Sequence, residues 1–118
     1  GLLPDHARPW HDASCFSWVR LLEEHWRRIR GELDAAERGG AAWPEVRGHE
    51  KSLVLNQGSW LEYPLLGYSR HQDAAARIHC PLTCKLLSGI EAVRSHAECY
   101  PDQKTAMFSR LTPGTHIK

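Results

Sequence analysis

The sequence has no long hydrophobic run, no leader-like start and no large excess of charge. No stretch approaches the ~18 consecutive apolar residues that a membrane-spanning helix needs. Nothing at the N-terminus resembles a signal peptide, and because the chain begins with Gly1 we expect processing or excision from a longer chain. A formal net charge of +1 gives no reason to expect a nucleic-acid partner. The sequence indicates no compartment, and a membrane anchor outside this chain is compatible with it.

Cysteines are few, and their spacing does not suit a disulfide framework. The four cysteines are spread along a chain of 118 residues that is long enough to build a core of its own. We therefore expect free, buried thiols. One alternative stays open, a zinc-stabilised fold that uses His79, Cys80, Cys84 and Cys99 as ligands. It lacks the second ligand pair at the spacing typical of structural zinc sites.

Familiar catalytic motifs are also absent. The sequence has no Gly-rich phosphate loop, no G-x-S-x-G elbow and no H-E-x-x-H. Its eight histidines do produce two His-x-acid spacings, His71 with Asp73 and His96 with Glu98, as in iron sites with two histidines and one carboxylate. A chain with this many histidines and acidic residues produces such matches by chance, so we predict neither pair as a metal site.

A helical pattern is present in the first third of the chain. Large apolar residues recur in steps of three or four, at Trp18, Leu22, Trp26, Ile29 and Leu33. Asp12 and Ser14 are suitable capping residues ahead of this stripe, and Gly39-Gly40 ends it. Because one helix cannot bury such a stripe alone, we expect its two tryptophans to be packing anchors against a partner surface.

Strand-forming segments follow. Residues 52–57 and 60–68 are rich in strand formers, and Pro64 predicts an edge strand or a bulge in the second. Residues 80–93 repeat apolar side chains at helical spacing after Pro81 and predict a second short helix. Residues 107–111 predict another strand.

The end of the chain predicts a turn and a last strand. The Pro113-Gly114 pair is typical of a type II turn, which leads into residues 115–117. Residues 41–51 and 69–77 show no periodicity and are expected to be loops. The prediction is thus an α+β chain with two helices and three or four strands. Two helices cannot cover those strands, and the last strand has no obvious partner, so we expect the first part of a larger β-rich domain.

Several stretches resemble the aspartyl/asparaginyl β-hydroxylase family of iron(II)- and 2-oxoglutarate-dependent dioxygenases. They are LEEHWRRIRGEL (22–33), GSWLEYPLL (58–66), CPLTCKLL (80–87) and FSRLTPGTHIK (108–118), of which the last is the most specific. The resemblance implies a double-stranded β-helix, or jelly roll. Residues 1–118 would form an incomplete jelly roll with an N-terminal helix and a second short helix, cut before the iron ligands.

The resemblance also implies chemistry. In this family Fe(II) and 2-oxoglutarate activate oxygen, and the β-carbon of an Asp or Asn side chain in a protein or peptide is hydroxylated. Ser109 matches the serine that helps to bind 2-oxoglutarate, and Trp60 and Glu62 match positions near the substrate. The first iron-binding histidine would follow Lys118, and His116 matches a histidine that is not a ligand. No catalytic or metal-binding residue is therefore assigned here, and neither iron nor 2-oxoglutarate is expected on this chain.

A second hypothesis is a non-catalytic interaction module on the same scaffold. The coding sequence beyond Lys118 would separate the two. A histidine shortly after, with a further histidine and an arginine downstream, would favour the dioxygenase, whose isolated first part should be inactive. A stop codon or other residues would favour the module.

Overall fold

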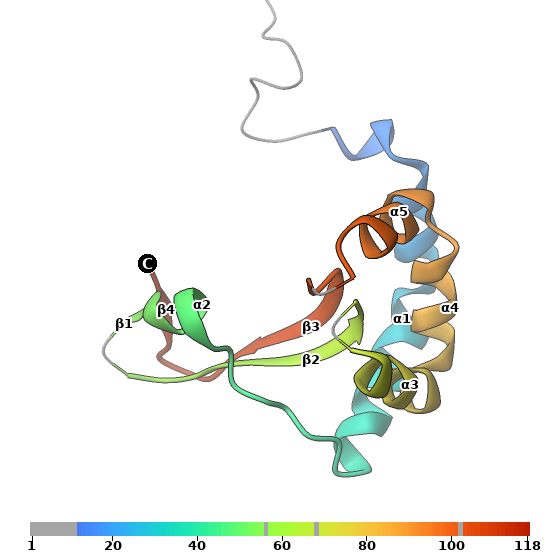
Figure 1. The fold of residues 1–118 in the computed structure, drawn as a ribbon. Coiled ribbons are helices and arrows are strands. Elements are labelled where there is room, and N and C mark those ends of the chain that lie inside the picture. The colour runs from blue at the N-terminus through green and yellow to red at the C-terminus, as the bar shows by residue number, and fades with distance from the viewer. Residues whose placement is uncertain (1–11, 56, 68, 102) are drawn as a thin grey trace, which may run out of the picture.

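The computed structural model describes residues 12–55, 57–67, 69–101 and 103–118. A 3₁₀ helix (Ala13–Cys15) leads into the elements α1 (Ser17–Arg38), α2 (Gly48–Ser52), β1 (Val54–Leu55), β2 (Trp60–Leu66), α3 (Arg70–His79), α4 (Pro81–Ser88), α5 (Glu91–Cys99), β3 (Ala106–Leu111) and β4 (His116–Ile117). Helices α1, α3, α4 and α5 gather at one end of the β2–β3 pair, whereas α2, β1 and β4 lie at the other end (Figure 1). Within the described residues, no helix is both long and apolar enough to cross a membrane.

Helix α1 confirms the first predicted helix but starts later than expected. The Asp12 carboxylate accepts the Ser14 N–H at 3.0 Å and so caps the 3₁₀ helix, while α1 begins at Ser17 without a side-chain cap. Gly39 ends α1 as predicted and donates its N–H to the Ala35 carbonyl.

Strands β2 and β3 form an antiparallel pair with Trp60 opposite Leu111. The register shifts between Pro64 and Leu66, which confirms the predicted irregularity, because proline has no N–H for the ladder. The strand expected over residues 52–57 is reduced to β1. Asn56 and Tyr68, which the predicted strands included, lie outside the described residues. The described strands form two separate two-stranded sheets, and the jelly roll stays a prediction.

The last strand has a partner, so the expectation that it would be unpaired is wrong. Strand β4 runs antiparallel to β1, with Val54 opposite Ile117. The predicted turn is confirmed, because the Thr115 N–H donates to the Thr112 carbonyl at 3.0 Å and Gly114 has a φ of 82°. Because β1 and β4 lie far apart in the sequence, no local sequence pattern predicts that they pair.

The prediction of two helices is wrong, since α2 and α3 occupy segments expected to be loops. Helix α3 is capped by the Ser69 hydroxyl, which accepts the Gln72 N–H, and it buries the small side chain of Ala76 rather than a large apolar stripe. The helix predicted over residues 80–93 is divided in two, because Gly89 caps α4 and α5 begins at Glu91.

The core lies between the helices and one face of the β2–β3 pair. Its buried residues are Ala36, Tyr63, Leu65, Ala76, Cys80 and Cys84. Tyr63 and Leu65 alternate along β2 and therefore point to the same face, where Phe108 of β3 packs beside Tyr63 with ring centroids 6.5 Å apart. The opposite face carries the pairs of Trp60 with Leu111 and of Glu62 with Ser109.

The apolar stripe of α1 is only partly covered. Trp18 is 37% exposed and Trp26 is 57% exposed, so the prediction that both are packing anchors is wrong. Helix α1 packs on α3 and α4 and buries Ala36, but the part of the stripe between Leu22 and Leu33 lines an open groove toward β3.

Candidate functional site

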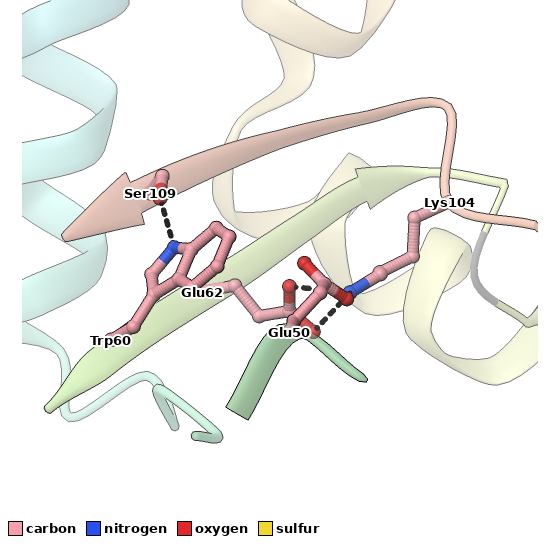
Figure 2. Close-up of polar contacts among 5 residues, drawn as sticks. All are labelled: Glu50, Trp60, Glu62, Lys104 and Ser109. Atoms are coloured by element: carbon pink, nitrogen blue, oxygen red, sulfur yellow. Dashed lines mark hydrogen bonds and ion pairs between the residues drawn. The ribbon is translucent and has the colours of Figure 1, made fainter. Parts of the chain in front are cut away.

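The three residues predicted for cosubstrate and substrate lie together on one face of the β2–β3 pair. Glu62 is directly opposite Ser109, and Trp60 is two positions before Glu62 on the same strand, so their side chains share a face. Figure 2 shows the Trp60 indole reaching across to Ser109, with the Glu62 side chain farther along β2, next to Lys104. The structure therefore brings together what the resemblance predicted at separate positions.

The Trp60 indole fixes the orientation of the Ser109 hydroxyl. The Trp60 Nε1–H donates to Ser109 Oγ at 2.6 Å. An indole nitrogen is a donor only, so Oγ must be the acceptor in this bond. The hydroxyl hydrogen of Ser109 is then free to donate elsewhere. Since Ser109 is exposed, that hydrogen is available to an anionic ligand.

Glu62 is held inside the protein by an ion pair. Lys104 Nζ lies 2.8 Å from Glu62 Oε2 and 2.6 Å from Glu50 Oε1, joining β2 to α2 (Figure 2). The Glu62 side chain is only 4% exposed. Burial lowers the Lys104 pKa, but hydrogen bonds to the two carboxylates outweigh it, and the pKa is raised. This geometry gives Glu62 a structural partner, and its contact with substrate stays a prediction.

Lys104 and Glu50 were not found from the sequence. Lys104 lies between the predicted helix over residues 80–93 and the predicted strand over residues 107–111, and Glu50 lies in a segment expected to be a loop. They are 54 residues apart along the chain, so no short-range spacing marks the pair. Only the fold brings the two residues together.

The GSW and TPGT segments, which carry part of the resemblance, are bonded to each other. The Ser59 N–H donates to the hydroxyls of Thr112 at 2.8 Å and Thr115 at 3.0 Å. Gly58 has a φ of 95° and lies against the Thr115 side chain, where a Cβ would overlap it. This contact fixes the start of β2 against the end of β3, next to Trp60 and Ser109.

The other two stretches of the resemblance are joined in the same way. Glu32 of α1 accepts the N–H groups of Leu82 and Thr83, both at 2.7 Å, and the Thr83 hydroxyl at 2.6 Å. A carboxylate here satisfies backbone donors at the start of α4 that have no partner within the helix. The CPLT motif therefore anchors α4 to α1.

No candidate metal site is formed within the part of the chain that the structure describes. There, no three His, Cys, Asp or Glu side chains come together. All four cysteines are free, but only Cys80 and Cys84 are buried, so the expectation of buried thiols is wrong for the exposed Cys15 and Cys99. The zinc alternative is also wrong, because its ligands do not come together. Burial raises the pKa of the Cys80 and Cys84 thiols to about 11. Both thiols are therefore neutral at physiological pH and are poor ligands and nucleophiles.

The other histidine candidates are also dispersed. His71 is exposed on α3, and its neighbour Asp73 accepts the Gly67 N–H at 3.1 Å. The His96 ring bonds the Thr105 hydroxyl at 2.9 Å. His116 is exposed on β4, opposite Leu55.

Comparison with known protein families gives a match that covers most of the residues described above. The model of the aspartyl/asparaginyl beta-hydroxylase family matches residues 23–118, which is most of the chain. Searches of curated proteins and of solved structures found no significant match. The family match includes both Trp60 and Ser109. The chain belongs to the aspartyl/asparaginyl β-hydroxylase family.

Proposed function

We propose that this chain is part of an Fe(II)- and 2-oxoglutarate-dependent dioxygenase that hydroxylates the β-carbon of Asp or Asn side chains in a protein or peptide. The family match over residues 23–118 supports a hydroxylase. The observation that carries the proposal is the exposed Ser109 hydroxyl, whose oxygen is occupied by Trp60 and whose hydrogen is free. Iron and 2-oxoglutarate, when bound, supply the oxidative chemistry.

Ser109 has the chemistry needed for one carboxylate of 2-oxoglutarate. A hydroxyl that donates to a carboxylate forms a charge-assisted hydrogen bond, which is shorter and stronger than a neutral one. The bond from Trp60 polarises the Ser109 hydroxyl and makes it a better donor. Trp60 therefore orients Ser109 as well as presenting its ring to the substrate side.

The described residues do not fit an iron site, because no three suitable side chains meet among them. We propose that the ligands of the iron come from polypeptide beyond this chain, which would complete the incomplete jelly roll. The role of the chain is then to supply the strand pair that holds the cosubstrate carboxylate.

The cosubstrate role is tested by the variant Ser109→Ala in a protein extended by its own coding sequence. Loss of a hydrogen bond to a carboxylate should raise the KM for 2-oxoglutarate roughly 10- to 100-fold. Succinate formation is the measurement. Ser109→Thr keeps the hydroxyl and should recover most of the loss, and Ser95→Ala, an exposed serine of α5, is the control. Equal KM values in all three variants would contradict the assignment.

A non-catalytic module remains the second candidate, favoured by the absence of any metal-ligand cluster in the described residues. The coding sequence after Lys118 distinguishes the dioxygenase from the non-catalytic module. Two histidines and an arginine support the dioxygenase, and a stop codon supports the module.

A further inference from the structure

Glu62 brings a buried negative charge close to the Ser109 hydroxyl. The two residues are directly opposite each other, and the Glu62 N–H donates to the Pro44 carbonyl on the other side of β2, so they form a pair without mutual backbone hydrogen bonds. The Cβ atoms of such a pair are about 5 Å apart. Because the Glu62 side chain is only 4% exposed, solvent and salt screen its charge weakly. The charge of Glu62 therefore acts on any ligand at Ser109.

Among the described residues, the cation paired with Glu62 is Lys104. Its Nζ lies 2.8 Å from Oε2 and 3.1 Å from Oε1 of Glu62, so it contacts both carboxylate oxygens. Glu50 of α2 supplies a third acceptor at 2.6 Å. An ammonium group has three N–H donors, and these three contacts use all of them. Lys104 therefore has no donor left for a further ligand, and its effect on a ligand at Ser109 is indirect.

This ion pair has two effects on the Ser109 site. The charge of Lys104 cancels the charge of Glu62, and the remaining negative charge is on Glu50, whose side chain is more exposed, at 35%, and better screened. The pair also turns the Glu62 carboxylate along β2 toward Lys104 (Figure 2). In that position Glu62 leaves the hydroxyl hydrogen of Ser109 to another acceptor.

We propose that Lys104 is a positioning residue of the cosubstrate site, which neutralises Glu62 and holds it aside so that an anionic ligand can bind at Ser109. This inference rests on the proposed function, in which Ser109 receives a carboxylate of 2-oxoglutarate. Two carboxylates within a few ångströms of each other repel, and weak screening strengthens the repulsion. A buried glutamate next to a carboxylate site therefore requires a cation of its own.

The alternative is that Lys104 only ties α2 to β2. In that case its loss would destabilise the fold and displace α2, and removal of the Glu62 charge as well would not repair the damage. If Lys104 acts by neutralising Glu62, removal of both charges should restore binding although the tie between α2 and β2 is still missing.

The test measures the Kd for 2-oxoglutarate of the protein extended by its own coding sequence, without added iron, through the indole N–H resonance of Trp60. Lys104→Met should raise the Kd about 5- to 20-fold, because the uncompensated Glu62 repels the ligand. Lys104→Arg keeps the charge and should stay within about threefold of the parent. The control is Lys51→Met, which removes an exposed cation of α2 that is paired with Glu45, and it should leave the Kd unchanged.

The double variant Lys104→Met/Glu62→Gln should bind 2-oxoglutarate nearly as tightly as the parent. An unchanged Kd for Lys104→Met, or a double variant as weak as Lys104→Met, would overturn the inference. Ser109→Ala, titrated in the same way, tests the proposed function separately. Weak binding by Ser109→Ala with normal binding by Lys104→Met would refute the role of Lys104 alone, whereas normal binding by Ser109→Ala would refute the cosubstrate site itself.

Discussion

Gly58 is the residue whose size matters most for joining the two strands of the site. Its φ of 95° disfavours any other residue, and a Cβ there would overlap the Thr115 side chain. Gly40 has a φ of 77°, but nothing lies within 4 Å of a Cβ built there. A substitution at Gly40 would therefore strain the backbone without a steric clash. We predict that Gly58→Ala lowers the free energy of unfolding by about 2 to 4 kcal/mol and Gly40→Ala by about 1 kcal/mol. Urea unfolding measures both, and equal losses would contradict the proposed close approach.

The buried thiols predict a loss of stability at alkaline pH. The pKa of Cys80 and Cys84 is raised from 9.0 to about 11, chiefly by burial. Below pH 9 the thiols are protonated in both the folded and the unfolded chain, and their contribution to the free energy of unfolding is fully present. Between about pH 9 and 11 the unfolded chain loses protons that the folded chain keeps, so stability falls by roughly 1.4 kcal/mol per pH unit for each thiol.

Urea unfolding across this pH range tests the thiol prediction. The variant Cys84→Ala should show a shallower decline between pH 9 and 11 than the parent chain, although it is less stable throughout because of its cavity. An unchanged slope would mean that Cys84 is not shielded from solvent. In the native chain, alkylation should modify the exposed Cys15 and Cys99 and spare Cys80 and Cys84.

Sequence reasoning singled out Ser109, Trp60 and Glu62 only through the family resemblance, and it did not place them beside one another. It could not supply their contacts, because the register of β2 against β3 decides that Trp60 bonds Ser109 and that the buried Glu62 faces the partly buried Lys104. Lys104, which completes the ion pair, has no signal in its own neighbourhood.

At the scale of elements, the contact between α1 and α4 depends on one carboxylate. Glu32 accepts three hydrogen bonds at the start of α4. We predict that Glu32→Ala lowers the free energy of unfolding by about 1 to 3 kcal/mol, because two backbone N–H groups and a hydroxyl lose their acceptor. Glu23→Ala, an exposed residue of the same helix, should change it by less than about 0.5 kcal/mol.

Thermal or urea unfolding measures the role of Glu32. A loss for Glu32→Ala no greater than for Glu23→Ala would contradict the capping role. The control matters because both substitutions remove one negative charge from α1, so a general charge effect would appear in both.

Elements with local patterns were predictable from the sequence, and elements made by distant pairing were not. Helix α1, strand β2 with its irregularity at Pro64, and the turn at Gly114 follow from apolar periodicity, proline and glycine. Helix α2 has five residues and α3 buries only a small alanine, so neither has a strong apolar period. The pairing of β1 with β4 joins opposite halves of the chain.

At the scale of the molecule, the apolar stripe of α1 is the largest difference between expectation and structure. The periodicity predicts a buried face, yet Trp26 is 57% exposed and lines the groove beside β3. The pattern identified the apolar face correctly. It could not say that the described elements cover only part of that face.

The central claim, that the chain is part of a 2-oxoglutarate-dependent hydroxylase whose metal ligands lie elsewhere, is tested most directly by turnover. The measurement is succinate formation from 2-oxoglutarate with added Fe(II) and a peptide containing Asp or Asn, for this chain and for the protein extended by its own coding sequence. We predict none for the 118-residue chain and turnover with hydroxylated peptide for the extended protein. Turnover by the short chain, or none by a folded extended protein, would contradict the account.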